Sequence, residues 1–265
     1  MSTTPRFPTG TFRPAPGRGR PTAMLTAQTR TELLLTLRNG EQILLTLLIP
    51  LALLIGLSTL EALPVPVEAG LPRVDAVTPR ILALAVMSTA FTGAAIALGF
   101  DRRYGVLKRL AATALPRWSM ITGRVLANLA VIGIQLVALG GVAALLGWRP
   151  VAAGIGWALL VVLLGGLAFG ALGVLLGGSL RAEVVLALAN AVWFVLLLAG
   201  GVVVPLDALP DGLAAVVRFL PSGALAEGLR VALTEGAAPA PSSLLVLLGW
   251  AVAAGAVAVR TTRLS

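Results

Sequence analysis

The chain has 265 residues, of which 58% are hydrophobic and 12% charged, and its formal net charge is +9. A soluble domain is about half apolar and about a quarter charged. The composition therefore excludes an ordinary soluble enzyme or nucleic-acid-binding domain and predicts an integral membrane protein.

The sequence contains no Cys and no His, which excludes disulfides, thiolate or imidazole metal sites and every mechanism that depends on histidine. Its single lysine, Lys108, follows Leu107 instead of a glycine, so the chain has no phosphate-binding loop of the Gly-Lys-[Ser/Thr] type. We predict no catalytic and no metal-ligating residue on this chain. Any ATP-driven work needs a second polypeptide.

Residues 1–22 are rich in Pro, Gly, Thr and Arg and contain no acidic residue. They predict a disordered basic cytoplasmic tail, which either satisfies the orientation rule alone or binds lipid. Residues 23–41 predict an amphipathic helix whose apolar face, with Leu34 and Leu37, is interrupted by Arg30 and Arg38. Such a helix is expected to lie at the membrane interface. Its polar face carries Thr29, Glu32, Thr36 and Asn39.

Residues 42–265 predict an all-α transmembrane domain, because six apolar runs of about 18 residues or more follow one another. The predicted spans are 43–60, 81–100, 125–147, 155–178, 184–204 and 242–259. Fifteen of the 20 Lys and Arg residues fall on the side of the N-terminus, which predicts that both termini are cytoplasmic. This orientation accounts for the positive charge without nucleic acid.

The predicted spans contain no charged residue and few polar ones. The amides and hydroxyls at Thr89, Asn128, Gln135 and Asn190 are either interhelical hydrogen-bond partners or a candidate substrate path. A path without charges suits a hydrophobic drug, a lipid or a glycolipid better than an ion. In the fourth span, the pairs Gly166/Gly170 and Gly173/Gly177 indicate close helix packing within the bundle, with a contact between two copies as the alternative.

The segment between the second and third spans is dense in basic residues. It reads Asp101-Arg-Arg-Tyr-Gly-Val-Leu-Lys-Arg-Leu-Ala-Ala-Thr-Ala-Leu-Pro-Arg117 and ends with Gly123-Arg124. Val106, Leu107 and Leu110 share one face of a helix of about two to three turns, which Pro116 would end. This helix could dock into a groove of a partner, or the segment could be a loop that only fixes topology.

The order Arg-x-x-Gly-x-Leu-x-x-Leu-x-x-Thr-x-x-x-Arg, followed by Gly-Arg, resembles the signature loop of type-2 ABC exporter permeases. Arg103, Val106 and Ala114 stand where the family commonly has Glu, Thr and Pro. The resemblance implies that Thr29, Glu32 and Thr36 belong to a connecting helix at 23–41. It also implies an ATPase-coupling loop formed by Arg102, Arg103, Tyr104, Gly105, Leu107, Lys108, Arg109, Leu110, Thr113 and Arg117.

Residues 205–241 are too long for a tight turn and too interrupted by proline to span, so they predict two short outer helices broken at Pro221. The segment is similar to the outer segment of the same family. That resemblance implies an outer gate, with a simple folded loop as the alternative. The residues assigned to the gate are Pro205, Pro210, Pro221, Glu227 and Arg230.

The resemblance implies the permease subunit of an ATP-driven exporter that moves a hydrophobic or lipid-like substrate outward across a bacterial inner membrane. It implies two permease chains, identical or homologous, surrounded by membrane lipids. ATP and Mg would bind to separate ATP-binding subunits, and this chain would hold no cofactor. Two alternatives remain. One is a six-span substrate-binding subunit of an importer. The other is a membrane-embedded lipid-modifying enzyme, whose nearest carboxylate pair would be Asp207 and Asp211.

Overall fold

A computed structural model describes residues 20–60, 71–112, 115–199 and 210–261. Within these residues the chain is 87% helical and contains no strand, which confirms the all-α prediction. The elements are α1 (Pro21–Arg38), α2 (Gly40–Thr59), α3 (Arg73–Met87), the π-helix η1 (Ser88–Gly93), α4 (Ala94–Arg103), α5 (Val106–Ala111), α6 (Arg117–Leu145), the 3-10 turn η2 (Ala152–Gly154), α7 (Ile155–Ser179), α8 (Ala182–Ala199), α9 (Asp211–Val217), α10 (Pro221–Arg230), the π-helix η4 (Val231–Glu235) and α11 (Pro241–Thr261).

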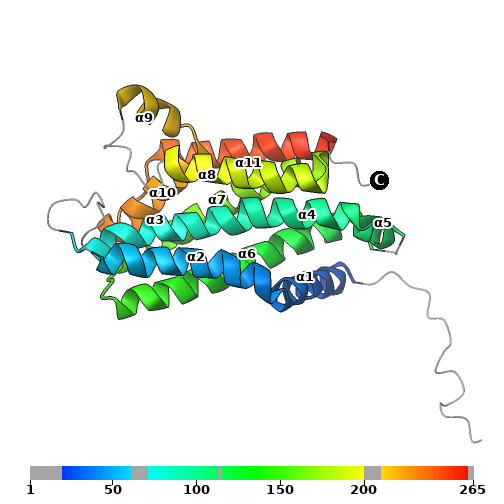
Figure 1. Cartoon of the computed structure of the whole chain (residues 1–265), viewed down its shortest axis with the longest axis horizontal. Coiled ribbons are helices and arrows are strands. Elements are labelled where there is room, and N and C mark those ends of the chain that lie inside the picture. Colours follow the sequence, from blue (N-terminus) through cyan, green and yellow to red (C-terminus); the bar gives the residue numbers. More distant parts are fainter. Residues whose placement is uncertain (1–19, 61–70, 113–114, 200–209, 262–265) are drawn as a thin grey trace, which may run out of the picture.

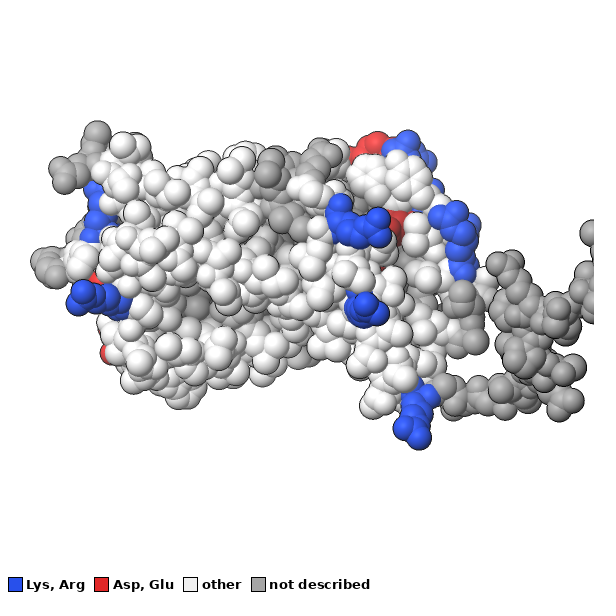
Figure 2. Space-filling model, turned by 90° about the horizontal axis from the view of Figure 1, so that it is seen from below, with Lys and Arg blue, Asp and Glu red and all other residues white. Residues whose placement is uncertain are grey.

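The long helices run side by side along one axis and form an elongated bundle (Figure 1). The short helix α5 lies at one end of the bundle, together with α1 and the last turn of α11, and α9 lies toward the other end. We call these the α5 end and the α9 end. Charged side chains lie toward the two ends on the face shown in Figure 2, and the middle of that face carries none. This distribution is the one expected for a bundle whose middle is surrounded by hydrocarbon.

Four described helical segments are long and apolar enough to cross a membrane: Arg73–Arg103, Trp118–Leu145, Ala152–Ser179 and Pro241–Thr261. A fifth is counted if Asp211–Val217 and Pro221–Glu235, which are bent by 91° at their break, form one span. Thr46–Thr59 and Ala182–Leu198 are shorter apolar helices. The end of the fifth predicted span, residues 200–204, lies outside the described residues, as does most of the predicted basic tail.

The observed helix boundaries differ from the predicted ones where a charged residue was taken as the end of an apolar run. The second span was predicted at 81–100, but α3, η1 and α4 form one continuous helical segment from Arg73 to Arg103. The third was predicted from residue 125, but α6 begins at Arg117, because Pro116 has extended backbone angles and starts the helix instead of only ending the previous one. At the N-terminus, α1 begins at Pro21, inside the segment predicted as tail.

The segment α3–η1–α4 is the centre of the bundle, since most of its residues are buried. Its middle is the π-helix η1, a form that usually occurs as a short interruption of an α-helix. At the start of η1, Ser88 donates a hydrogen bond to the carbonyl of Leu84 (2.7 Å) and accepts one from Trp193 Nε1 on α8 (2.9 Å). The irregular turn is thereby tied to a neighbouring helix.

The glycines of α7 pack within the bundle, as the first interpretation predicted. A Cβ atom at Gly173 would lie 2.8 Å from the carbonyl oxygen of Phe91 in η1, and one at Gly177 would overlap the carbonyl oxygen of Ala95 in α4. Gly166 faces Leu129 of α6, whereas nothing lies within 4 Å of a Cβ at Gly170. Three of the four glycines therefore allow α7 to approach other helices of the same chain.

Replacing Gly173 by Leu is expected to destabilise the chain by about 1–3 kcal/mol, because the side chain would have to displace the backbone of η1. Gly170→Leu is the matched control, since the same side chain would enter open space on the same helix. The measurement is the thermal midpoint of each variant in detergent. Equal midpoints for the Gly173 variant and the unaltered chain would contradict the packing. A loss in Gly170→Leu would indicate a contact between copies.

Candidate functional site

A turn at Gly105 separates the short helix α5 from α4. α4 continues to Arg103, and Gly105 then adopts a left-handed conformation (φ +68°) that a side chain would disfavour. α5 begins at the next residue and has only six residues, so it is shorter than the two to three turns predicted. Leu107 is buried, whereas Lys108 and Arg109 are exposed to solvent. The short helix thus shows a basic surface at the end of the bundle.

Two residues assigned to the coupling loop have internal partners instead. Arg102 donates from Nη1 to the carbonyl oxygens of Gly177 (3.0 Å) and Leu180 (3.2 Å), at the end of α7 where carbonyls lack helical partners. Arg103 forms an ion pair with Glu183 in the first turn of α8. Both arginines therefore fasten the end of α4 to the α7–α8 turn.

The other assigned residues are placed as follows. Tyr104 is largely exposed, and Leu110 is half-buried in α5. Thr113 lies outside the described residues, and Arg117 is the first residue of α6. Among the described residues assigned to the coupling loop, Arg103, Tyr104, Lys108 and Arg109 are exposed, and Arg103 is paired with Glu183.

The helix α1 packs along the first half of α6. Its polar face is turned toward the protein: Gln28 lies against Gly123, and Thr29 and Thr36 are partly buried. On its other side Leu34 and Leu35 are exposed. This arrangement fits an interfacial helix whose leucines face lipid while its polar residues contact the bundle.

One guanidinium joins three helices at the α5 end. Arg124 of α6 forms an ion pair with Asp101 of α4, and its Nε lies 3.5 Å from Oε2 of Glu32 on α1. Gln28 donates a hydrogen bond to the other oxygen of Glu32 (2.9 Å). The side chains of Arg124, Asp101 and Glu32 are only 24%, 28% and 16% exposed. We call these three residues the Arg124 node.

Sequence reasoning noted Arg124 at the end of the loop and placed Glu32 on the connecting helix, but it did not predict that they meet. The only sequence signal was complementary charge. Glu32 and Arg124 are 92 positions apart, and no spacing rule links residues on two different helices. The node connects α1 to the helix that carries α5, so the two candidate coupling elements are mechanically linked.

The residues assigned to an outer gate lie toward the α9 end. Pro210 precedes the first residue of α9 and Pro221 is the first residue of α10, which confirms the break predicted at Pro221. Arg230 pairs with Glu227 (2.8 Å) and with Glu235 (2.9 Å), where α10 passes into η4. Pro205 lies outside the described residues.

The helix α10 is more deeply packed than an outer loop would be. Leu225 and Leu229 are fully buried, and the helix contacts α3, α7 and α11. At the start of α7, Gly154 lies directly against the carbonyl of Ala232 in η4, with no room for a side chain. The segment from α10 to η4 is therefore a core element of the bundle at this end.

The four residues of the candidate substrate path do not form one surface. Gln135 is 4% exposed; its Oε1 accepts a hydrogen bond from Thr89 (2.6 Å), and its Nε2 donates one to Thr46 on α2 (3.1 Å). Asn190 is exposed and donates to the carbonyl of Leu186 in its own helix (2.9 Å), and Asn128 is partly exposed. The amide of Gln135 thus links α2, η1 and α6 inside the bundle.

Gln135→Leu is expected to lower the stability of the bundle by about 1–2 kcal/mol, because two interhelical hydrogen bonds are lost and both threonine hydroxyls lose a partner. Asn190→Leu is the matched control, since its amide bonds only to its own helix. Thermal unfolding in detergent measures both. If the two variants unfold at the same temperature, the buried amide does not hold the helices together.

Comparison with known proteins agrees with this arrangement. A family model described as ABC-2 type transporter matches residues 24–234, from α1 to η4, and no match is found among curated proteins. The matched region includes α1, α5, the Arg124 node and the bent helices at the α9 end. The match supports an ABC permease, the membrane subunit of a transporter. The chain is therefore a multi-pass membrane protein and belongs to the ABC-2 type transporter family.

Proposed function

We propose that the chain is the permease subunit of an ATP-driven exporter and that α5 is the helix that contacts the ATP-binding subunit. The observation that carries this proposal is the position of α5. It is a basic, exposed helix joined through Tyr104 and Gly105 to α4, the end of the most deeply buried helical segment. A displacement of α5 by a partner would move the centre of the bundle.

The Arg124 node supports a second contact through α1. Because Glu32 and Asp101 share one guanidinium, a force on α1 or on α4 is transmitted to the start of α6. Arg102 and Arg103 extend the same connection to α7 and α8. In this proposal, ATP and Mg bind to the partner subunits, whose closure on ATP binding moves α1 and α5 together.

We further propose six spans, with α2 and α8 added to the four long apolar segments, and with the α5 end in the cytoplasm. The basic residues of α4, α5 and the start of α6 support this orientation. It places both ends of the chain on the cytoplasmic side of a bacterial inner membrane and α9, α10 and η4 on the outer side, where they would close the path between transport cycles. A second permease chain, identical or homologous, would complete the path.

The absence of charged side chains from the apolar parts of the same bundle supports a substrate class. Residues 81–100, 125–145, 155–179 and 241–259 contain no charged side chain. A hydrophobic or lipid-like substrate therefore fits better than an ion, whose route would be marked by ionisable residues. The proposed direction of transport is outward.

The test is affinity purification of the full chain from its native host in mild detergent, followed by mass spectrometry of everything that co-purifies. We expect a near-stoichiometric P-loop ATPase, and any second membrane chain would distinguish a heterodimer of permeases from a homodimer. If the protein is folded and monodisperse but no ATPase accompanies it, the proposed function is wrong.

A further inference from the structure

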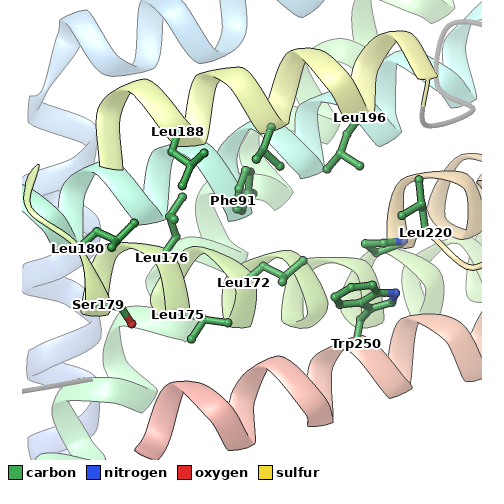
Figure 3. Close-up of a pocket in the computed structure, with 12 residues that line it drawn as sticks. Phe91, Leu172, Leu175, Leu176, Ser179, Leu180, Leu188, Leu196, Leu220 and Trp250 are labelled. Carbon is green, nitrogen blue, oxygen red and sulfur yellow. The ribbon is translucent and has the colours of Figure 1, made fainter. Parts of the chain in front are cut away.

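An apolar groove of about 470 Å³ runs between α7 and α8. Figure 3 shows Leu188 and Leu196 of α8 and Leu176 of α7 pointing into the space between the two helices. Leu172 continues the α7 wall and Phe91, from the π-helix η1, lies at its base. The volume lies within the range of about 300–1,000 Å³ that is usual for ligand sites.

The two ends of the groove differ in their surroundings. Toward the α9 end it is lined by Leu220, Pro221 and Trp250, and the indole nitrogen of Trp250 is already bonded to the carbonyl of Phe219 (2.8 Å). Toward the α5 end the last lining residue is Leu180. A ligand that fills the groove would therefore place its polar part at the α5 end, where the hydroxyl-bearing Ser179 also lies.

The polar end of the groove adjoins two arginines. Arg181 directly follows the lining residue Leu180, and Arg260 precedes Thr261, whose hydroxyl lies 3.4 Å from that of Ser179. Both arginines are exposed and neither forms an ion pair with a described residue. The nearby Glu183 is already paired with Arg103.

We propose that this groove is a binding site for an anionic membrane phospholipid, with one acyl chain between α7 and α8 and the phosphate near Arg181 and Arg260. The apolar lining selects the acyl group, and the two exposed guanidinium groups select a negative headgroup over a zwitterionic one. The assignment of this lipid to the cytoplasmic leaflet rests on the proposed function. The lipid site itself is argued from the groove and the two arginines alone.

The test is native mass spectrometry of the full chain, with any subunits that accompany it, after delipidation and titration with dioleoyl phosphatidylglycerol or dioleoyl phosphatidylcholine. We expect one tightly retained phosphatidylglycerol per chain and at least tenfold weaker retention of phosphatidylcholine. Arg181→Gln with Arg260→Gln is expected to remove this preference while leaving the phosphatidylcholine signal. Both arginines are exposed, so this double variant should fold normally.

Leu188→Trp tests the acyl part of the site, because the larger ring would fill the groove. Leu186→Trp is its matched control: the two leucines are 40% and 42% exposed on the same helix, but Leu186 does not line the groove. Only Leu188→Trp should lower phosphatidylglycerol retention, by tenfold or more. Equal retention of the two lipids by the unaltered chain, or unchanged retention in Leu188→Trp, would overturn the proposal. The proposal would also be overturned if Leu188→Trp weakened association between two copies of the chain without lowering lipid retention. A second copy, and not a lipid, would then occupy the groove.

The lipid titration requires no ATPase. A chain that purifies without an ATP-binding subunit would contradict the proposed function and leave the lipid site to be judged by its own measurement.

Discussion

Reversing Lys108 and Arg109 to Glu is expected to abolish both ATPase co-purification and transport while leaving the fold intact. Both side chains are exposed on α5 and form no hydrogen bond or ion pair with a described side chain, so their loss should change stability by no more than about 0.5 kcal/mol. At an interface the effect is larger, because like charges placed opposite one another cost several kcal/mol. A cost of about 3 kcal/mol corresponds to roughly 100-fold weaker binding.

The measurement is the amount of ATPase retained per permease, together with the thermal midpoint of the permease. Lys108→Gln with Arg109→Gln should give an intermediate loss, since it removes charge without introducing repulsion. The matched control is Arg149→Glu with Arg218→Glu, which reverses two exposed charges toward the α9 end and should retain the ATPase. If Lys108→Glu/Arg109→Glu assembles and transports normally, α5 is not the coupling helix.

The parts of the fold that sequence reasoning predicted are those governed by local signals. Apolar runs located the helices of the bundle, and prolines marked the break at Pro221 between α9 and α10. The boundaries failed where a polar residue was taken as the end of a helix. Arg102 and Arg103 continue α4 because the carbonyls of α7 and the carboxylate of Glu183 give them partners that a hydropathy profile does not contain.

What could not be predicted depends on which helices are neighbours. The sequence indicated which residues form the polar face of α1, but not that this face is turned toward α6, where Arg124 and Gly123 provide a charge and a space for it. The bond between Thr89 and Gln135 joins residues 46 positions apart on different helices. The π-helix η1 has no proline and no distinctive composition, so neither its position nor its contact with Trp193 was visible in the sequence.

Arg124→Gln is expected to destabilise the α5 end more than the loss of any exposed ion pair there. Removing the guanidinium leaves the carboxylates of Asp101 and Glu32 partly buried and close to each other without a counter-charge. Breaking a buried pair in this way costs about 3–5 kcal/mol, and the partial exposure of these groups favours the lower end of that range. The thermal midpoint of the full chain in detergent measures the effect.

Arg103→Gln is the matched control for this variant. It removes an arginine from a neighbouring ion pair at the same end of the bundle, but the side chains of Arg103 and Glu183 are 50% and 62% exposed. An ion pair so well solvated contributes about 0–1 kcal/mol. Arg124→Lys should restore part of the stability lost in Arg124→Gln, because the ammonium keeps the charge but cannot bond to two carboxylates as a planar fork. Equal losses for Arg103→Gln and Arg124→Gln would contradict the role of the node.

The node also predicts a functional outcome that differs from that of α5. In the assembled transporter, Arg124→Gln should still bind the ATPase, because Lys108 and Arg109 are unchanged, but α1 is no longer held to α4 and α6. ATP hydrolysis should therefore continue while transport falls. A double-mutant cycle of Arg124→Gln with Asp101→Asn should show a coupling energy above about 1 kcal/mol, as expected for two residues in direct contact. If the two changes are additive, or if ATPase activity and transport fall in parallel, the node is a packing contact and does not transmit the motion of α1.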